Sequence, residues 1–309
     1  MNSVKDLCAI CNQDALKELY SGSFDVHEGN QNADLDAIDY KCTSMSHHIK
    51  PMIARCGYCK MVQIPRSQQP INLLQTYADV VDEDYLNNFQ VKKRTFSHSY
   101  QKIKKYLPKN GNLLEIGSYC GLFLGEALND GLHCTGIEPS TWAANYAQVH
   151  LKNCKIYNLP MEEAIKDFKD QFDVVVSWDV IEHVQDPLKM MKEVFTLLKK
   201  DGYFIFSTII IDSQIAKLMG KKWHWIMDMH LYYFSAESLQ YLFKESGFKL
   251  IEEQGYRHYA SMKYAYSKLC FCFPESIAKM MMKLNCLVPN IVLPFNLGDV
   301  KYFVLKKIE

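Results

Sequence analysis

The sequence has no excess of charge of either sign. Among its 309 residues, 35 Lys and Arg balance 35 Asp and Glu, so the formal net charge at pH 7 is zero. A neutral chain has no overall electric field that would draw it onto nucleic acid, whose binding proteins are usually basic. We therefore expect no nucleic-acid partner.

Long apolar runs are missing as well. No uninterrupted apolar stretch reaches the roughly 18 residues that a membrane-spanning helix requires. Five charged residues interrupt the first twenty positions, which argues against a signal peptide: Lys5, Asp6, Asp14, Lys17 and Glu18. We expect a cytoplasmic protein without a transmembrane segment. In that setting the 11 cysteines indicate free thiols or metal ligands rather than a disulfide framework.

The glycine pattern of a dinucleotide site is also absent. In the stretch LLEIGSYCGLFLGEAL (113–128), an apolar strand runs into a glycine turn that is followed by a helical pattern. The turn contains Gly117 and Gly121, with Tyr119 between them, whereas a dinucleotide-binding turn reads G-x-G-x-x-G. The missing glycines argue against an NAD-dependent oxidoreductase, which stays open as the second enzyme class.

Four cysteines near the N-terminus form two Cys-x-x-Cys pairs, Cys8 with Cys11 and Cys56 with Cys59. A two-residue gap lets a tight turn point both thiolates at one ion, and two such turns complete a tetrahedral zinc site. The spacer, residues 12–55, is longer than that of common zinc ribbons, so unmetallated or redox-active thiols stay open. The spacer also contains the alternative ligands Cys42, His47 and His48. We predict a structural zinc ion without a catalytic role, because four thiolates leave no open position.

Strand and helix patterns alternate through the rest of the chain. Apolar strands are expected at 112–117, 132–138, 154–157, 172–178 and 202–210. Helices are expected within 70–107 and at 121–129, 140–150, 161–168, 187–199 and 236–246. Alternating residues at 248–254 and 300–306 could pair as an edge. This alternation predicts a doubly wound α/β domain.

Candidate ligand-binding residues follow the ends of the expected strands. The carboxyl ends of parallel strands hold the ligand in doubly wound folds. The residues at those ends are Glu115, Gly117, Glu138, Met161, Glu162, Ser177, Trp178 and Asp179. Glu138 lies about 20 residues after Gly117, a separation that places a carboxylate beside ribose hydroxyls. A single acid here is also explained as a helix cap or surface residue, so the joint placement carries the prediction of a nucleoside site.

Three stretches resemble motifs of class I S-adenosylmethionine (SAM) dependent methyltransferases: LEIGSYCG, GIEPS and FDVVVSWDVIEHVQDP. The resemblance spans roughly residues 110–255 and implies a Rossmann-like, seven-stranded methyltransferase sheet with SAM as cofactor. In that family Glu115 would approach the methionine ammonium and Glu138 the ribose hydroxyls. Tyr119 replaces the usual middle glycine and could narrow the methionine end. The implied SAM site comprises Glu115, Gly117, Tyr119, Gly121, Glu138, Pro139, Met161, Glu162, Trp178 and Asp179.

The cysteine pairs, together with MVQIPR, MHLYYFS and NLGDVKYFVLKK, are similar to a bacterial branch that carries a small zinc-binding module ahead of the SAM fold. That branch includes enzymes that methylate nucleotide-linked deoxysugars, and others that tailor surface polysaccharides or natural products. The expected division is a zinc-ribbon-like module (1–68), a helical connector (69–108), a SAM-binding core (109–256), and a C-terminal cap with the final strand (257–309).

Two histidines are candidates for a general base. His183 follows Glu182 just after the fourth strand, and His230 lies in the aromatic segment KKWHWIMDMHLYYFS. Histidine has a suitable ordinary pKa for this role. His183 could instead position the loop, and His230 could be a packed core residue. In the related sugar C-methyltransferases a glutamate precedes the histidine that matches His230, whereas this chain has Met229. We therefore favour O-methylation of a sugar hydroxyl over C-methylation of a nucleotide-linked keto-deoxysugar.

The acceptor is expected to be a small molecule or glycan, which could be nucleotide-linked or lipid-linked. The apolar C-terminal stretch 267–295 could touch a membrane or a lipid-linked substrate, or belong to the core or to a homodimer interface. The alternative from another class is a non-catalytic, SAM-binding zinc scaffold. The sequence alone names neither the acceptor nor the oligomeric state.

Overall fold

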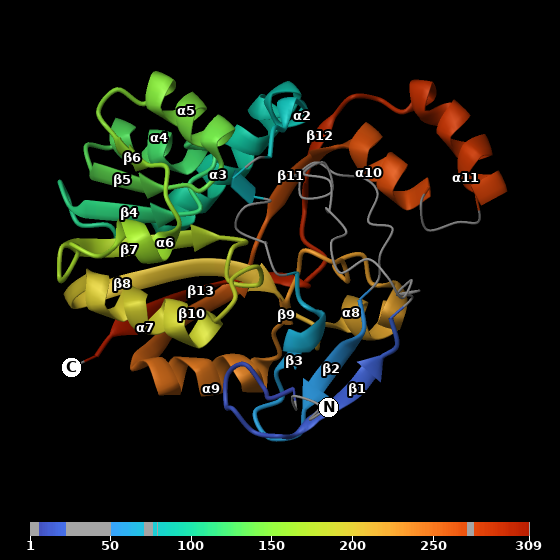
Figure 1. Cartoon of the computed structure of the whole chain (residues 1–309). Helices are drawn as coiled ribbons and strands as arrows, with labels where there is room; N and C mark the ends of the chain where they lie inside the picture. The colour runs from blue at the N-terminus through green and yellow to red at the C-terminus, as the bar shows by residue number, and fades with distance from the viewer. Residues whose placement is uncertain (1–5, 23–50, 71–76, 79, 271–274, 309) are drawn as a thin grey trace.

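A seven-stranded mixed sheet forms the centre of the protein (Figure 1). The computed structural model describes residues 6–22, 51–70, 77–78, 80–270 and 275–308. In spatial order the strands are β10 (Phe248–Gly255), β13 (Val300–Lys307), β8 (Leu198–Ile209), β7 (Phe172–Trp178), β4 (Asn112–Ile116), β5 (His133–Ile137) and β6 (Lys155–Tyr157). Strands β8 to β6 run parallel, whereas β13 runs antiparallel to both β8 and β10. The predicted doubly wound α/β class and its edge pair are confirmed.

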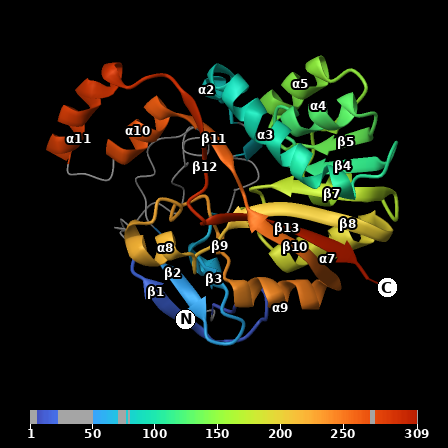
Figure 2. The same cartoon turned by 180° about the vertical axis from the view of Figure 1, so that it is seen from behind.

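Helices cover both faces of this sheet (Figures 1 and 2). One face carries α3 (Phe89–Ile103), α4 (Leu122–Asn129) and α5 (Thr141–His150). The other carries α7 (Pro187–Leu197) and α9 (Ala236–Ser246). The central strand β7 is almost wholly apolar and buried, as expected for a parallel strand covered on both faces. The core therefore lies in two layers, one on each side of the sheet.

Local signals explain where the helices on the second face begin and end. Asp186 accepts a hydrogen bond from the backbone N–H of Lys189, and Pro187 opens α7. A reciprocal cap between Ser235 and Ser238 begins α9, and Gly247 ends it at a φ of 82°. These boundaries agree with the sequence pattern.

Two expected helix ends were wrong. Helix α7 ends at Leu197 rather than residue 199, and β8 begins at Leu198 rather than at Gly202, because Leu198 is already extended and pairs with Phe172. The helix expected at 161–168 is the single turn α6 (Met161–Ala164), which stops at Ile165. Phe168 instead packs its ring against Phe172, 5.4 Å between centroids.

The segment before the core, which was expected to be helical, is not one continuous helix. Helix α2 (Glu83–Asn87) is followed after Asn88 by α3, and the 3-10 turn η3 (Lys104–Tyr106) closes the segment. Residues 71–76 and 79 of the expected helix lie outside the described residues.

A second, smaller sheet joins the N-terminal segment to the core. Its order is β1 (Leu16–Tyr20), β2 (Ile53–Cys56), β3 (Val62–Gln63) and β9 (Tyr232–Tyr233). Strand β9 comes from the second half of the chain and pairs antiparallel with β3. The backbone N–H of Ile64 extends this pairing by donating to the Leu231 carbonyl at 2.9 Å. The cysteine-bearing segment is thus bonded directly to the core.

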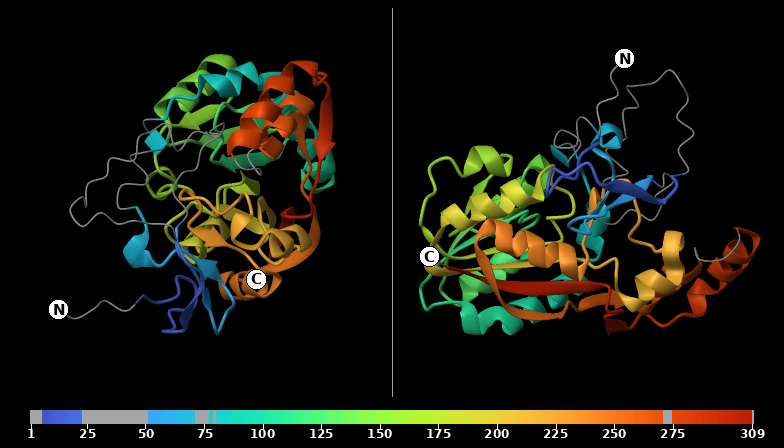
Figure 3. Two further views of the ribbon diagram at one scale, coloured as in Figure 1. Left: turned by 90° about the vertical axis from the view of Figure 1, so that its right-hand side faces the viewer. Right: turned by 90° about the horizontal axis from the view of Figure 1, so that it is seen from below.

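The C-terminal segment forms an arm beside the core (Figures 1 and 2). Strands β11 (His258–Ser261) and β12 (Val292–Phe295) pair at its base, and α10 (Met262–Cys270), α11 (Glu275–Met282) and η5 (Lys283–Leu287) form its end. Met280 and Leu287 are 64% and 77% exposed, so the end of the arm leaves apolar side chains in water. Figure 3 shows the small sheet and the arm at the same end of the main sheet.

The remaining elements are short: η2 (Arg66–Gln68), α8 (Gln214–Met219) and η4 (Gly220–Lys222). Within the described part of the chain, every helix is too short or too polar to cross a bilayer, in agreement with the expectation from hydropathy.

Candidate active site and metal centre

The glycine turn after β4 brings the backbone close to its neighbours. Gly117 has a φ of 72°, and a Cβ there would lie 2.5 Å from Cγ2 of Val180. Gly121 has a φ of 75° and begins α4, where a Cβ would lie 2.4 Å from Cδ1 of Leu151. Any other residue would be strained and crowded at both positions. The turn therefore needs these two glycines, although it lacks the third one of a dinucleotide site.

Tyr119 occupies the middle of this turn with a φ of 45°, a left-handed conformation that costs a non-glycine residue about 1–2 kcal/mol. Its ring packs edge-on against Tyr85 of α2, 4.6 Å between centroids, and lies 6.0 Å from Trp142 of α5. Aromatic pairs of this kind contribute about 0.5–1.5 kcal/mol each, which offsets much of the backbone strain. The tyrosine thus joins α2 to the turn.

Glu138, at the end of β5, is buried and holds the turn. One carboxyl oxygen accepts the backbone N–H of Tyr119 at 2.8 Å, and the other accepts that of Ser140 at 2.7 Å. Burial raises the pKa of Glu138 to about 7, against the opposing effect of these two hydrogen bonds. The pKa of this carboxyl group therefore lies near neutral pH. Its ionised form is stabilised by the two backbone N–H groups that donate to it.

Glu115 lies one strand away and is 2% exposed. Burial and then the negative charge of Glu138 hold its pKa well above the ordinary value. Within the described residues, its Oε2 atom has no hydrogen-bond partner. A cationic ligand beside Glu115 would stabilise the ionised form of this buried carboxyl group. SAM carries two cationic groups, an ammonium and a sulfonium.

Other buried polar atoms at the same strand ends also lack protein partners in the described part of the chain. They are Oγ of Ser118, Oγ of Ser177 and Nε1 of Trp178. Native proteins rarely leave such atoms unsatisfied unless a ligand or water completes them. Ser177 pairs in register with Ile116, so two neighbouring strands contribute to this group. The residues present fit a polar, positively charged nucleoside ligand.

The remaining residues implied by the resemblance lie around the same edge. Asp179 has a φ of 54° and accepts the hydroxyl of Ser207 at 2.6 Å. Trp178 is buried between the rings of Phe123 and Tyr256. Glu138 and its neighbour Pro139 are tied to β6 through the side-chain amide of Asn158, and Met161 and exposed Glu162 open the next helix.

Glu182, His183 and His230 form a cluster beyond β7. One ligand atom from each residue lies within 4.8 Å of the others. The ring centroids of the two histidines are 4.7 Å apart. The backbone carbonyl of Glu182 accepts the N–H of Leu231 at 2.9 Å, which ties the two parts of the cluster together. We call these three side chains the Glu-His-His cluster.

Hydrogen bonds orient both rings of this cluster. Nδ1 of His183 lies 2.9 Å from the Met229 carbonyl and 2.8 Å from the hydroxyl of Tyr77. Nδ1 of His230 lies 2.8 Å from the Trp225 carbonyl. A carbonyl only accepts, so a neutral ring satisfies it with a proton on Nδ1 and leaves the lone pair on Nε2.

Burial sets the charge of this cluster. Removal from water lowers the pKa of His183 to about 4, so its ring is neutral at pH 7. Burial, and then the charge of Asp179, hold the pKa of Glu182 well above the ordinary value. Thr208 donates its hydroxyl to one oxygen of this carboxyl at 3.0 Å. The cluster therefore presents a neutral base and a buried carboxyl at the strand ends.

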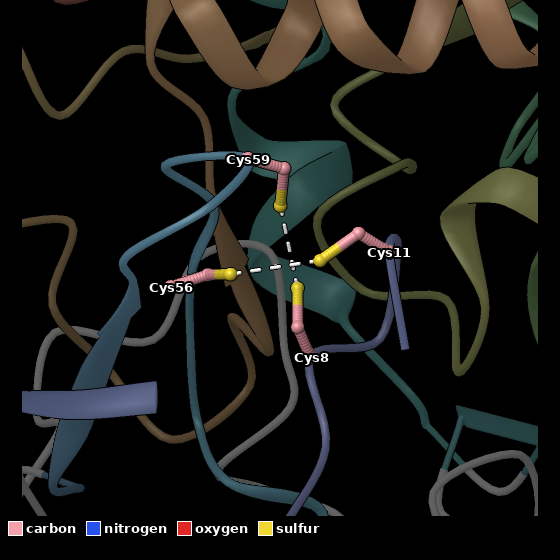
Figure 4. A group of neighbouring side chains, drawn as sticks. All are labelled: Cys8, Cys11, Cys56 and Cys59. Atoms are coloured by element: carbon pink, nitrogen blue, oxygen red, sulfur yellow. Dashed lines mark hydrogen bonds between the residues drawn. The ribbon is translucent and has the colours of Figure 1, made fainter. Parts of the chain in front are cut away.

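The four N-terminal cysteines converge on one point (Figure 4). The sulfurs of Cys8 and Cys59 are 3.4 Å apart, those of Cys11 and Cys56 are 3.6 Å apart, and all four lie within 4.8 Å of one another. Four thiolates at about 2.3 Å from a zinc ion have a similar separation.

The backbone turns of the two Cys-x-x-Cys pairs orient these sulfurs toward one another. The backbone N–H of Tyr58 points at Sγ of Cys56 at 3.4 Å, and left-handed residues, Asn12 and Lys60, follow the two pairs. The cluster fits a closed structural zinc site. The alternative ligands Cys42, His47 and His48 lie outside the described residues.

Sequence reasoning missed several residues that hold these sites. Tyr77 contacts His183 across more than a hundred positions, and nothing in its own segment indicates that contact. Ser207 and Thr208 hold Asp179 and Glu182. Two hydroxyl residues at the end of the apolar run YFIFST were a usable signal, because polar groups at that strand end face the ligand edge.

Comparisons with known proteins agree with this geometry. A family model described as a methyltransferase domain matches residues 89–253. A ubiquinone biosynthesis O-methyltransferase of Acinetobacter baylyi is 27% identical over 159 residues, which cover 46% of this chain and 65% of that protein. The enzyme of the same name from Pelagibacter ubique is 32% identical over 120 residues, 37% of this chain and 50% of that protein. The chain thus matches about half to two thirds of these relatives' length.

Solved structures show the same fold. A SAM-dependent methyltransferase from Archaeoglobus fulgidus superposes with a TM-score of 0.51 at 13% identity, covering 73% of this chain and all of that one. A chain from the complex between the Haloferax volcanii Trm112 methyltransferase activator and a methyltransferase gives 0.51 at 14% identity, covering 77% and 98%. Both likenesses show the Rossmann-like architecture alone.

Proposed function

Because the methyltransferase-domain model spans more than half of the chain, the protein belongs to that family, and we propose that it transfers a methyl group from SAM to an acceptor hydroxyl. The observation that carries this proposal is the group of buried polar atoms at the ends of β4 and β7 that have no protein partner among the described residues, Oε2 of Glu115 among them. That environment suits a cationic nucleoside.

Each part of the turn would have its own task in holding SAM. Gly117 and Gly121 allow the backbone to approach the ligand closely. Glu138 would accept the ribose hydroxyls, and the ionised Glu115 would face the methionine ammonium. Met161 and Glu162 would flank the adenine, while Trp178 and Asp179 would line the floor. When bound, SAM supplies a methyl group already activated by its sulfonium charge.

The Glu-His-His cluster would form the acceptor side. Acceptor methylation on oxygen requires that the hydroxyl loses its proton as the new O–CH₃ bond forms. The neutral ring of His183 offers an Nε2 lone pair for that proton, and His230 is the second candidate for the base. The carbonyls of Met229 and Trp225 hold the two rings in place. Burial excludes water from this edge, which favours transfer to the acceptor over hydrolysis.

The acceptor we propose is a small molecule or glycan, with a sugar hydroxyl as the first choice. The resemblance to sugar-modifying enzymes supports the sugar, and the names of the relatives support oxygen as the methylated atom. Both would be tested with radiolabelled SAM against two panels, one of nucleotide-linked and lipid-linked sugars and one of phenols and quinols. Labelled phenols without labelled sugars would contradict the sugar assignment. A cytoplasmic location and a homodimer stay predictions.

Glu138→Ala should lower SAM affinity about tenfold to a hundredfold at pH 8, because each hydrogen bond to a charged group contributes about 1.5–3 kcal/mol. The pKa near 7 predicts a pH dependence: the wild-type carboxyl gains a proton as pH falls, so wild-type SAM affinity should drop between pH 8 and pH 6. Glu138→Gln should abolish that slope.

Isothermal titration with SAM at pH 6, 7 and 8 measures both effects. Glu237→Ala, an exposed acid on α9, is the matched control and should titrate like the wild type. The metal content of all variants should stay unchanged. Equal SAM affinity in Glu138→Ala and wild type at pH 8 would remove Glu138 from the site.

A further inference from the structure

We propose that His258 binds the acceptor and holds one of its hydroxyl groups through Nε2 of the ring, at the carboxyl edge of the main sheet. His258 is the first residue of β11, where the chain leaves the main sheet for the arm. It belongs neither to the Glu-His-His cluster nor to the residues that the resemblance implies for SAM. The inference rests on the proposed function, because it assigns part of the acceptor site of that same reaction.

The fold brings His258 to the edge of the sheet where the ligand is expected. Strand β13 runs antiparallel to both β8 and β10, so β10 is parallel to β8 and ends at the same edge as β7. Tyr256 follows β10 directly and stacks on Trp178 at the end of β7, with 5.6 Å between ring centroids. The ring of His258 packs edge-on against Tyr256 at 4.6 Å. Three contacting rings therefore connect the end of β7 to His258.

The Nε2 atom of His258 is buried and has no hydrogen-bond partner within the described residues. A buried polar atom in this state costs free energy unless a ligand or a water molecule completes it. Nε1 of Trp225, in the aromatic segment that also contains His224, is in the same state in that part of the chain. The charge of His224 acts on His258, so the aromatic segment lies close to the start of β11. Polar atoms on these two segments suit a hydroxylated ligand better than an apolar one.

The ring of His258 is neutral at pH 7. Burial, the largest effect, lowers its pKa below the ordinary value, and the charges of Lys92 on α3 and of His224 act in the same direction. Asp179 after β7 and Asp299 before β13 act in the opposite direction. A neutral imidazole has one nitrogen that donates and one that accepts, so it pairs with a hydroxyl group without requiring a charge on the ligand.

The position of Asp179 relates His258 to the Glu-His-His cluster. The charge of Asp179 acts on Glu182 and His183 as well as on His258. Such interactions weaken with distance, so these three groups lie around one carboxylate. His258 would hold one hydroxyl of the acceptor, while the Glu-His-His cluster accepts the proton of the hydroxyl that is methylated. Acceptors with at least two hydroxyl groups, such as sugars and catechols, would therefore bind best.

Helix α3 holds the start of β11 in place. The backbone N–H of Tyr259 donates to Oγ1 of Thr95 at 2.9 Å, and the ring of Tyr259 packs against His98, 6.0 Å between centroids. His258 itself pairs in register with Phe295 of β12. The imidazole is thus carried by a strand that is fixed on both sides, which is what the positioning of an acceptor requires.

The test uses the full-length protein saturated with S-adenosylhomocysteine, the product that remains of SAM, so that no methyl transfer occurs. Two hydroxyl-bearing probes, catechol and UDP-glucose, are titrated by calorimetry and by NMR of protein labelled with ¹⁵N-histidine. We expect one probe to shift the Nε2 signal of His258 and to bind about tenfold more weakly in His258→Phe. His258→Gln keeps a polar atom near the position of Nε2 and should restore binding to within about threefold of wild type.

His98→Phe is the matched control, because His98 contacts β11 through the ring of Tyr259 and is not assigned to the acceptor. It should bind both probes like the wild type. The affinity for S-adenosylhomocysteine should stay the same in all three variants, since neither histidine is assigned to the cofactor.

Three results would overturn the inference. In the first, neither probe shifts the His258 signal of the wild type. In the second, His258→Phe binds the probe as tightly as the wild type. In the third, His258→Gln loses as much affinity as His258→Phe, which indicates a packing role alone. The wild-type NMR signal keeps the test decisive if His258→Phe does not fold. SAM titration of the same samples separates the two claims: a probe bound at His258 without any SAM binding sinks the proposed function and leaves this contact standing.

Discussion

The double variant His183→Asn/His230→Asn is expected to lose methyl transfer by about 10²–10⁴-fold, the contribution of a well-placed general base. Asparagine keeps an N–H donor near the position of Nδ1, so the bonds to the Met229 and Trp225 carbonyls are retained while the Nε2 lone pair is removed. SAM affinity should stay within about twofold, because neither ring is assigned to the cofactor. Single-turnover transfer to the best acceptor, alongside calorimetric SAM binding, measures both quantities.

The single variants and a pH profile then separate the two histidines. The pKa of His183 lies near 4, below the ordinary 6.5, so the ring is already unprotonated at pH 5. If His183 is the base, wild-type turnover at saturating SAM should stay level from pH 8 down to about 5 and fall only as pH approaches 4. Full activity in the double variant would show that neither histidine removes the proton.

If the four cysteines hold the predicted zinc ion, Cys56→Ser is expected to release it and to lower the melting temperature by about 10 °C. A structural zinc ion contributes about 10–16 kcal/mol of apparent binding energy in small domains, and losing one ligand removes several kcal/mol of it. For a domain of 150–250 residues each kcal/mol shifts the melting temperature by about 2–4 °C. Cys56 is fully buried and its backbone N–H bonds to the Met61 carbonyl beside β3, so the damage should reach the whole small sheet.

Cys286→Ser is the matched control for this experiment, because Cys286 is an exposed thiol on η5 that does not belong to the four-cysteine cluster. It should retain the metal and the wild-type melting temperature. Native mass spectrometry reads the zinc content, and calorimetry reads the transition. A Cys56→Ser protein that keeps one zinc ion and melts like the wild type would contradict the assignment of Cys56 as a ligand.

The central sheet was predictable because each of its strands is identified by its own residues. The apolar run of β7 and the strand–glycine–helix pattern around Gly117 are local signals. Strand β9 is different: it has two residues and exists because it pairs with β3, a partner that no local pattern identifies. Helix α7 ended early for a similar reason, since the pairing of Leu198 with Phe172 overrides its helical spacing.

The candidate site divides in the same way. Motif spacing identified Glu115 and Glu138 as acids at strand ends, but not that Glu138 would hold the backbone of Tyr119. The replaced glycine suggested that Tyr119 narrows the methionine end. The structure packs its ring against Tyr85 and Trp142, a contact that depends on where α2 lies. The histidines were identified singly, whereas their meeting with Glu182 required the fold.

The pairing of β3 with β9 has a consequence for synthesis on the ribosome. Val62 pairs with Tyr233, so the cysteine segment is translated long before the strand that completes its sheet. At about 5–20 residues per second, roughly ten to thirty seconds pass between the synthesis of β3 and the synthesis of β9. During that interval β3 is an unprotected edge, the kind of surface that aggregates. The predicted zinc ion, if bound early by the nascent chain, would keep β3 paired with β2 and leave only its β9 side open, so zinc supply should affect the yield of soluble protein.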